Sequence, residues 1–129
     1  MIALLRARRS FAVALSWGLA GSACGDAGPR ELAPATAAVS VGNNFFRSDR
    51  NGTENTAVDT VRVGGTVTWT WIQGNGLHSV ESLGSPSFTS SDEQSAQGSH
   101  HEVTFTEHGS YEYICSIHGE AMSGRVVVE

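Results

Sequence analysis

The sequence contains no lysine, so all eight of its basic residues are arginines. Three of them lie in the first nine residues, and residues 24–129 carry five arginines against thirteen acidic side chains, a net charge of −8 with histidine neutral. Phosphate binding needs a basic face, so this balance argues against nucleic acid as a partner. A basic protein partner is compatible with it.

Long apolar runs are also missing. The longest one, Phe11–Ala20, is too short to span a bilayer comfortably. It follows an arginine-rich start and precedes the small residues Gly21–Ala23. This order predicts an export signal over residues 1–23. The mature protein is therefore expected to be periplasmic or otherwise extracytoplasmic, and either soluble or tethered to a membrane.

Two finer interpretations of this signal stay open. Arg8-Arg9-Ser10-Phe11 resembles the R-R-x-F core of a twin-arginine signal. Ala23-Cys24-Gly25 resembles the end of a lipoprotein box, although Gly21 stands where that motif prefers leucine. A plain signal peptidase would also accept Gly21-Ser22-Ala23. Both peptidases would cut before Cys24, and a lipid anchor on Cys24 would tether the protein. Residues 24–37 have no apolar period and are expected to form a flexible tether.

Cysteine is scarce as well, since Cys24 and Cys115 are the only two. Exported proteins ordinarily pair their thiols, but Cys24 sits at the cleavage point, so Cys115 is expected to be unpaired. A lone thiol in an oxidising compartment tends to be lost unless it is buried or bound to a metal. The neighbours of Cys115 therefore carry the functional information.

Residues 38–129 show the pattern of one all-β domain. In Thr66–Trp71, valine and tryptophan alternate with threonine, which predicts a half-buried strand. Further strands are expected at Glu102–Thr106, Tyr111–Cys115 and Arg125–Glu129, with a short turn or helix within residues 90–98. Short strands separated by turn residues favour an antiparallel β-sandwich.

One of the two tyrosines on the strand before Cys115 is expected to form a tyrosine corner. Tyr111 and Tyr113 share a strand face with Cys115 because side chains alternate with a period of two. In a tyrosine corner the hydroxyl bonds back to nearby backbone, which is a structural role.

The segment Cys115–Met122 contains a thiolate, an imidazole and a thioether within eight residues, at Cys115, His118 and Met122. Copper, which cycles between Cu(I) and Cu(II), is the common metal that accepts all three ligand types. A second imidazole would complete a trigonal set with a weak axial sulfur, and His78 is the best-placed candidate. It follows a glycine-rich loop after the tryptophan strand.

Simpler interpretations of these residues are also available. Cys115 could be a buried core thiol and Met122 could fill a gap in the core. Zinc competes for cysteine and histidine, but structural zinc sites use more thiolates and no methionine. His100 and His101 are expected on opposite faces of a strand, which disfavours a joint metal site.

The C-terminal segment and the tryptophan strand together resemble one known family. Residues 111–129 read Y-x-Y-x-C-x-x-H-x-x-x-M-x-G-x-V-x-V, which resembles the C-terminal signature of plastocyanin-like cupredoxins. Gly64–Trp71 followed by His78 resembles the upstream part of the same pattern. The resemblance implies a Greek-key β-sandwich over residues 38–129 with one type 1, or blue, copper ion. The ligands it implies are His78, Cys115, His118 and Met122.

Two departures from the family pattern affect what is expected. Three residues separate His118 from Met122, whereas plastocyanin-type loops have four and amicyanin-type loops two. Met122 is therefore the least secure ligand. Ser79 stands where the family often has asparagine, and the shorter side chain is expected to leave the site less rigid or differently tuned.

The favoured function is that of a monomeric electron carrier between redox proteins, and the family resemblance implies His118 as the exit for the electron. Enzymatic activity is not expected, because four protein ligands leave no open position on the metal. The alternative is a periplasmic copper chaperone or buffer that delivers copper to a partner. A small copper enzyme would require Met122 to stay away from the metal, and a metal-free adhesion-type sandwich is the simplest alternative.

Overall fold

The computed structural model describes residues 28–29, 31–74 and 76–129. The predicted export signal over residues 1–23 and the candidate lipidation site Cys24 lie outside the described residues. Among the described residues, no helix has the length and apolar character needed to cross a bilayer. The compact unit begins at Glu31 and the first strand at Thr36, so the last two residues assigned to the 24–37 tether lie in a strand.

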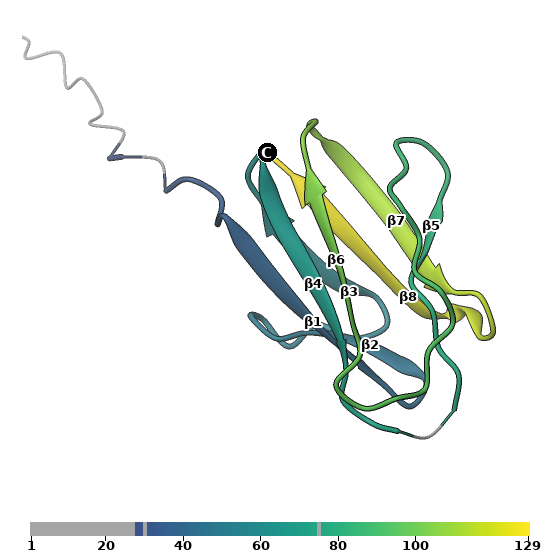
Figure 1. Ribbon diagram of the computed structural model, residues 1–129. Coiled ribbons are helices and arrows are strands. Elements are labelled where there is room, and N and C mark those ends of the chain that lie inside the picture. The colour runs from purple at the N-terminus through teal and green to yellow at the C-terminus, as the bar shows by residue number, and fades with distance from the viewer. Residues whose placement is uncertain (1–27, 30, 75) are drawn as a thin grey trace, which may run out of the picture. The chain divides into compact units, whose positions relative to one another are not determined.

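Eight strands in the described part of the chain form two four-stranded sheets that pack against each other (Figure 1). One sheet has the order β2-β1-β4-β6 and the other β3-β8-β7-β5. The predicted all-β sandwich is therefore confirmed. The strands are β1 (Thr36–Gly42), β2 (Phe45–Ser48), β3 (Ala57–Val61), β4 (Gly65–Trp71), β5 (Glu81–Leu83), β6 (His100–Phe105), β7 (Gly109–Cys115) and β8 (Gly119–Val128).

The pairing differs from a purely antiparallel sandwich, because each sheet contains one parallel pair. β1 runs parallel to β4, with Val39 opposite Trp69, and β3 runs parallel to β8, with Asp59 opposite Val126. Both pairs join strands that are distant in the sequence, and the chain crosses to the other sheet between them. Local alternation predicts where strands lie, but it carries no information on such long-range pairing.

The tryptophan strand is buried on the face that its alternation predicts. Val67, Trp69 and Trp71 on β4 are fully buried, whereas the threonines between them are partly exposed. Trp69 packs edge-on against Tyr113 of β7, with ring centroids 5.3 Å apart, and stacks on Phe88 at 5.6 Å. These contacts join the two sheets near the end of β7 that carries Cys115.

The three predicted strands in the C-terminal half are present, with different bounds. The final strand, β8, begins at Gly119 and not at Arg125, so it includes part of the predicted ligand segment. Residues 90–98 form no helix and contain a turn near Gly98. The tyrosine corner is confirmed at Tyr111, whose hydroxyl donates to the carbonyl oxygen of Glu107 at 3.0 Å.

One carboxyl group faces the interior. Asp59 lies on the inner side of β3 and is 1% exposed. Its Oδ1 accepts a hydrogen bond from the Ser48 hydroxyl at 2.7 Å. Burial raises the pKa of Asp59 above its ordinary value of 3.8, and this outweighs the Ser48 bond, which favours the charged form.

This buried carboxyl predicts a pH dependence of stability. Between pH 3.8 and the higher pKa of the folded state, the folded chain binds more protons than the unfolded chain at Asp59. The contribution of Asp59 to the free energy of unfolding therefore falls as pH rises through this window. In Asp59→Asn the decrease is expected to disappear, because asparagine keeps an acceptor for Ser48 and does not titrate.

Urea unfolding of both proteins from about pH 3.5 to pH 7 measures the difference. Glu102→Gln, which changes an exposed carboxyl on β6, is the control and should retain the wild-type slope. Parallel pH profiles for wild type and Asp59→Asn would show that the carboxyl does not titrate abnormally.

Candidate metal centre

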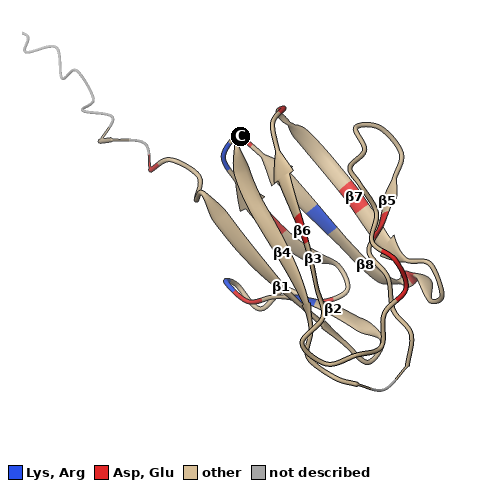
Figure 2. Cartoon of the chain, viewed as in Figure 1, with Lys and Arg blue, Asp and Glu red and all other residues tan. Residues whose placement is uncertain are grey.

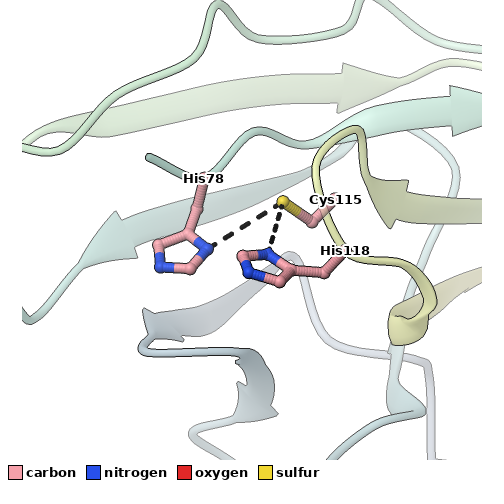
Figure 3. A group of neighbouring side chains, drawn as sticks. All are labelled: His78, Cys115 and His118. Atoms are coloured by element: carbon pink, nitrogen blue, oxygen red, sulfur yellow. Dashed lines mark hydrogen bonds between the residues drawn. The ribbon is translucent and has the colours of Figure 1, made fainter. Parts of the chain in front are cut away.

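Three of the predicted ligand side chains meet at one end of the sandwich. One donor atom from each of His78, Cys115 and His118 lies within 4.8 Å of the others. Figure 3 shows both imidazole rings turned toward the cysteine sulfur. The Cys115 Sγ is 3.9 Å from Nδ1 of His78 and 3.4 Å from Nδ1 of His118. Two loops that are distant in the sequence thus present a thiol and two imidazole nitrogens to one point.

Cys115 and His118 are positioned by the tight turn between β7 and β8. Cys115 is the last residue of β7, on the same inner face as Tyr111 and Tyr113, and it is fully buried. It pairs with Gly119, the first residue of β8, so the turn brings the His118 ring back onto the sulfur. Gly119 has a positive φ of 59°, a conformation that glycine adopts without steric cost.

His78 is held through its backbone. Its N–H donates to the Gln94 carbonyl oxygen at 3.0 Å, and its own carbonyl oxygen accepts from the Gln94 N–H at 2.9 Å. The indole N–H of Trp71 donates to the same carbonyl oxygen at 3.2 Å. The ring is 1% exposed and stacks on the His118 ring with centroids 4.9 Å apart.

The donor spacing fits a single metal ion. Ligands about 2.1 Å from one ion in a trigonal plane lie about 3.6 Å from one another. The two sulfur–nitrogen separations, 3.4 Å and 3.9 Å, lie on either side of this value. The sulfur therefore lies at a suitable distance from each imidazole nitrogen to share one ion with it, and all three donor atoms lie within 4.8 Å of one another.

The part of β8 that contains Met122 pairs irregularly with β7. Ile114 pairs with Ser123 and Cys115 with Gly119, so three extra residues of β8 lie opposite a single step of β7. Such bulges redirect side chains and are common beside functional sites. Two of the extra residues, Glu120 and Ala121, are exposed, and the third, Met122, is fully buried.

Ser79 ties the two ligand loops together. Its hydroxyl accepts a hydrogen bond from the backbone N–H of Ser116 at 3.0 Å and donates to the Ser116 hydroxyl oxygen at 2.8 Å. Ser79 follows His78 and Ser116 follows Cys115, so these bonds fix the residues next to two donors. Although the Ser79 side chain is short, it links the loop of His78 to the loop of Cys115.

The remaining histidines lie elsewhere, as expected. His100 is exposed, while the neighbouring His101 contacts the Thr89 carbonyl oxygen at 2.8 Å through Nε2. His108 is exposed in the turn before β7. Sequence reasoning missed the segment Ser90–Gln94, which pairs with His78. Its serine-rich composition resembled an ordinary loop, and its bonds to His78 and to Ser116 join residues distant in the sequence.

Comparisons with known proteins agree with this geometry. Residues 49–129 match the family model of copper-binding proteins of the plastocyanin/azurin family. A halocyanin from Natronomonas pharaonis is 35% identical over 111 residues, which cover 84% of this chain and 63% of the halocyanin. The chain therefore spans less than two thirds of that relative's length.

Solved structures are similar to most of this chain. A purple cupredoxin from Nitrosopumilus maritimus superposes with a TM-score of 0.55 and 27% identity, covering 74% of this chain and 99% of that one. An oxidised amicyanin variant superposes with a TM-score of 0.56 and 27% identity, covering 76% and 90% of the two chains.

Proposed function

Because this chain belongs to the plastocyanin/azurin family of copper-binding proteins, we propose that it is an exported blue-copper electron carrier. Its ligands are His78, Cys115, His118 and an axial Met122. The observation that carries the proposal is the placement of one cysteine sulfur against Nδ1 of two histidines from separate loops. When bound, copper supplies one-electron chemistry by cycling between Cu(I) and Cu(II).

The donor set favours copper over zinc. One thiolate, two imidazoles and a nearby thioether form the trigonal set with a weak axial ligand that is typical of blue-copper sites. Structural zinc sites instead recruit several thiolates and no methionine. With four protein ligands, no position on the metal is left for a substrate, which supports a carrier and not an enzyme.

The burial of the donors supports His118 as the route for electrons. Cys115 and His78 are almost completely buried, while His118 is partly exposed. Leu77 and Ile117, each next to a histidine ligand in the sequence, are both 48% exposed. Ile117, the residue before the accessible imidazole, and Leu77, the residue before His78, thus offer apolar contact area to a redox partner.

The charge on the second sheet supports a partner with a basic contact surface. Glu81, Glu112 and Glu120 lie on β5, β7 and β8, as the red segments in Figure 2 indicate. The arginine on these strands, Arg125, forms an ion pair with Glu112 at 3.7 Å. Complementary charge of this kind accelerates encounter more than it strengthens binding.

The burial of Cys115 and His78 argues against the chaperone alternative. A metal chaperone passes its ion on by exchanging ligands with a partner, which requires donors that the partner can reach. Cys115 and His78 come from two loops that are joined through Ser79 and Ser116. Release of the ion would require these loops to separate.

We also propose that residues 1–23 direct export, that the residues between Cys24 and the start of β1 at Thr36 connect the domain to the membrane, and that Cys24 carries the anchor. Cysteine use supports this arrangement. The thiol of Cys115 is buried among the proposed ligands, so it is not available to form a disulfide bond with Cys24. Mass spectrometry of the protein purified from its membrane fraction would detect the acyl groups.

Loading the purified chain with cupric ion tests the ligand assignment. One equivalent of copper is expected to give an intense thiolate-to-copper absorption band in the visible range. Cys115→Ser should abolish the band, because the thiolate is its electron donor, whereas His108→Ala on the exposed turn should leave it unchanged. A colourless copper complex, or preferential zinc binding, would contradict the proposal.

Met122 can be tested separately as an axial ligand and as a core residue. Met122→Leu conserves volume and should cost less than about 1.5 kcal/mol of stability in the metal-free protein. Met122→Ala leaves a cavity and should cost about 2–5 kcal/mol. If the thioether binds copper, Met122→Leu should also raise the reduction potential, because a donor to the more charged Cu(II) state is lost. An unchanged potential would assign Met122 to packing alone.

Electron exchange distinguishes the carrier from the chaperone. Mixing reduced and oxidised protein should give rapid self-exchange, measured by nuclear magnetic resonance line broadening. Ile117→Glu should slow it about tenfold or more, because like charges then meet in the encounter complex. Leu83→Glu, at an exposed apolar position on β5, is the matched control. Slow exchange in the wild type, together with fast loss of copper to a chelator, would favour the chaperone.

A further inference from the structure

The connection between β5 and β6 contains a segment that pairs with the His78 loop. Besides the two backbone bonds between Gln94 and His78, the Ser91 N–H donates to the Val80 carbonyl oxygen at 2.9 Å. The Val80 N–H donates to the Ser91 hydroxyl at 2.8 Å. His78 and Val80 are buried, so their backbone groups require partners within the protein. Ser90–Gln94 supplies these partners, and we call this segment the brace.

The brace also reaches the second ligand loop. The Ser116 hydroxyl donates to Oε1 of Glu93 at 3.1 Å, while its oxygen accepts from the Ser79 hydroxyl at 2.8 Å. The donors therefore run in one direction, from Ser79 through Ser116 to the Glu93 carboxylate. Hydrogen bonds in such a chain polarise one another, and a charged acceptor at the end strengthens the chain.

We propose that Glu93 is a positioning residue of the metal centre and that the brace is its third loop. Gln94 fixes the backbone of His78, and Glu93 orients Ser116 beside Cys115. A single short segment thus sets the separation of the two ligand loops. This inference rests on the proposed function for its effect on copper, but the mechanical link itself does not require metal.

The expected effect is on the precision of the site and not on folding. Glu93 and Ser116 are exposed, so their hydrogen bond contributes little to global stability. Ser79, in contrast, is only 3% exposed, and its hydroxyl depends on Ser116 for both of its bonds. Without Glu93, the Ser116 hydroxyl can rotate, which weakens the link at Ser79.

Amide hydrogen exchange of the metal-free protein tests the link directly. In Glu93→Ala, the Ser116 amide, which donates to Ser79, should exchange about two- to tenfold faster than in the wild type. Glu93→Gln keeps an acceptor without the charge and should restore most of the wild-type protection. Ser116→Ala removes this bond and also the bond from the Ser79 hydroxyl, so it should speed exchange of the residue 116 amide at least as much. An unchanged rate in Glu93→Ala, or the same increase in Glu93→Gln, would overturn the proposal.

The copper-loaded protein supplies the second readout. Glu93→Ala should change the ratio of the visible absorption bands, which reports ligand geometry, while Glu93→Gln should not. Glu120→Gln removes an exposed charge next to the ligand turn without touching the brace and serves as the control for charge. It should shift the potential and leave the band ratio unchanged. Wild-type protein without a thiolate band would contradict the proposed function, while the metal-free exchange result would still decide whether the brace acts.

Discussion

The metal centre depends on how β4 packs against β7. Trp69 contacts the Tyr113 ring across the sandwich, and Trp71, two residues later, donates to the backbone of His78. Tyr113 is two residues before Cys115, so one set of aromatic contacts fixes the position of both ligand loops. A shift of one residue in either strand would turn these side chains to the opposite face and separate the donors.

The donors of the site differ in burial, since Cys115 and His78 are buried and His118 is partly exposed. A buried thiol and imidazole lose their hydration, and this loss is offset only when hydrogen bonds or a metal replace the water. Cys115 and His78 are buried in this way, and metal binding is therefore coupled to the stability of the fold. His118 keeps partial contact with solvent, which makes it the donor nearest to an approaching partner.

Much of the centre could be predicted from the sequence because its signals are local. Cys115, His118 and Met122 lie within one hairpin, from the end of β7 to the start of β8. The alternation of Trp69 and Trp71 with threonine identifies the strand that leads to His78. The parallel pairs and the brace could not be predicted, since they join segments distant in the sequence. Ser79 is shorter than the asparagine of the family pattern, and its two hydrogen bonds to Ser116 could not be predicted either, because residues 79 and 116 are distant in the sequence.

The three residues between His118 and Met122 belong to a strand and not to a loop, because β8 begins at Gly119. Met122 belongs to a strand and lies in phase with the buried residues Gly124, Val126 and Val128. Its side chain is thus placed inside by strand register, with the bulge opposite Cys115 absorbing the extra residues. All four proposed ligands are therefore held by backbone contacts or packing that exist without metal. Rigid placement of this kind keeps the geometry similar in both oxidation states of copper, which is what rapid one-electron transfer requires.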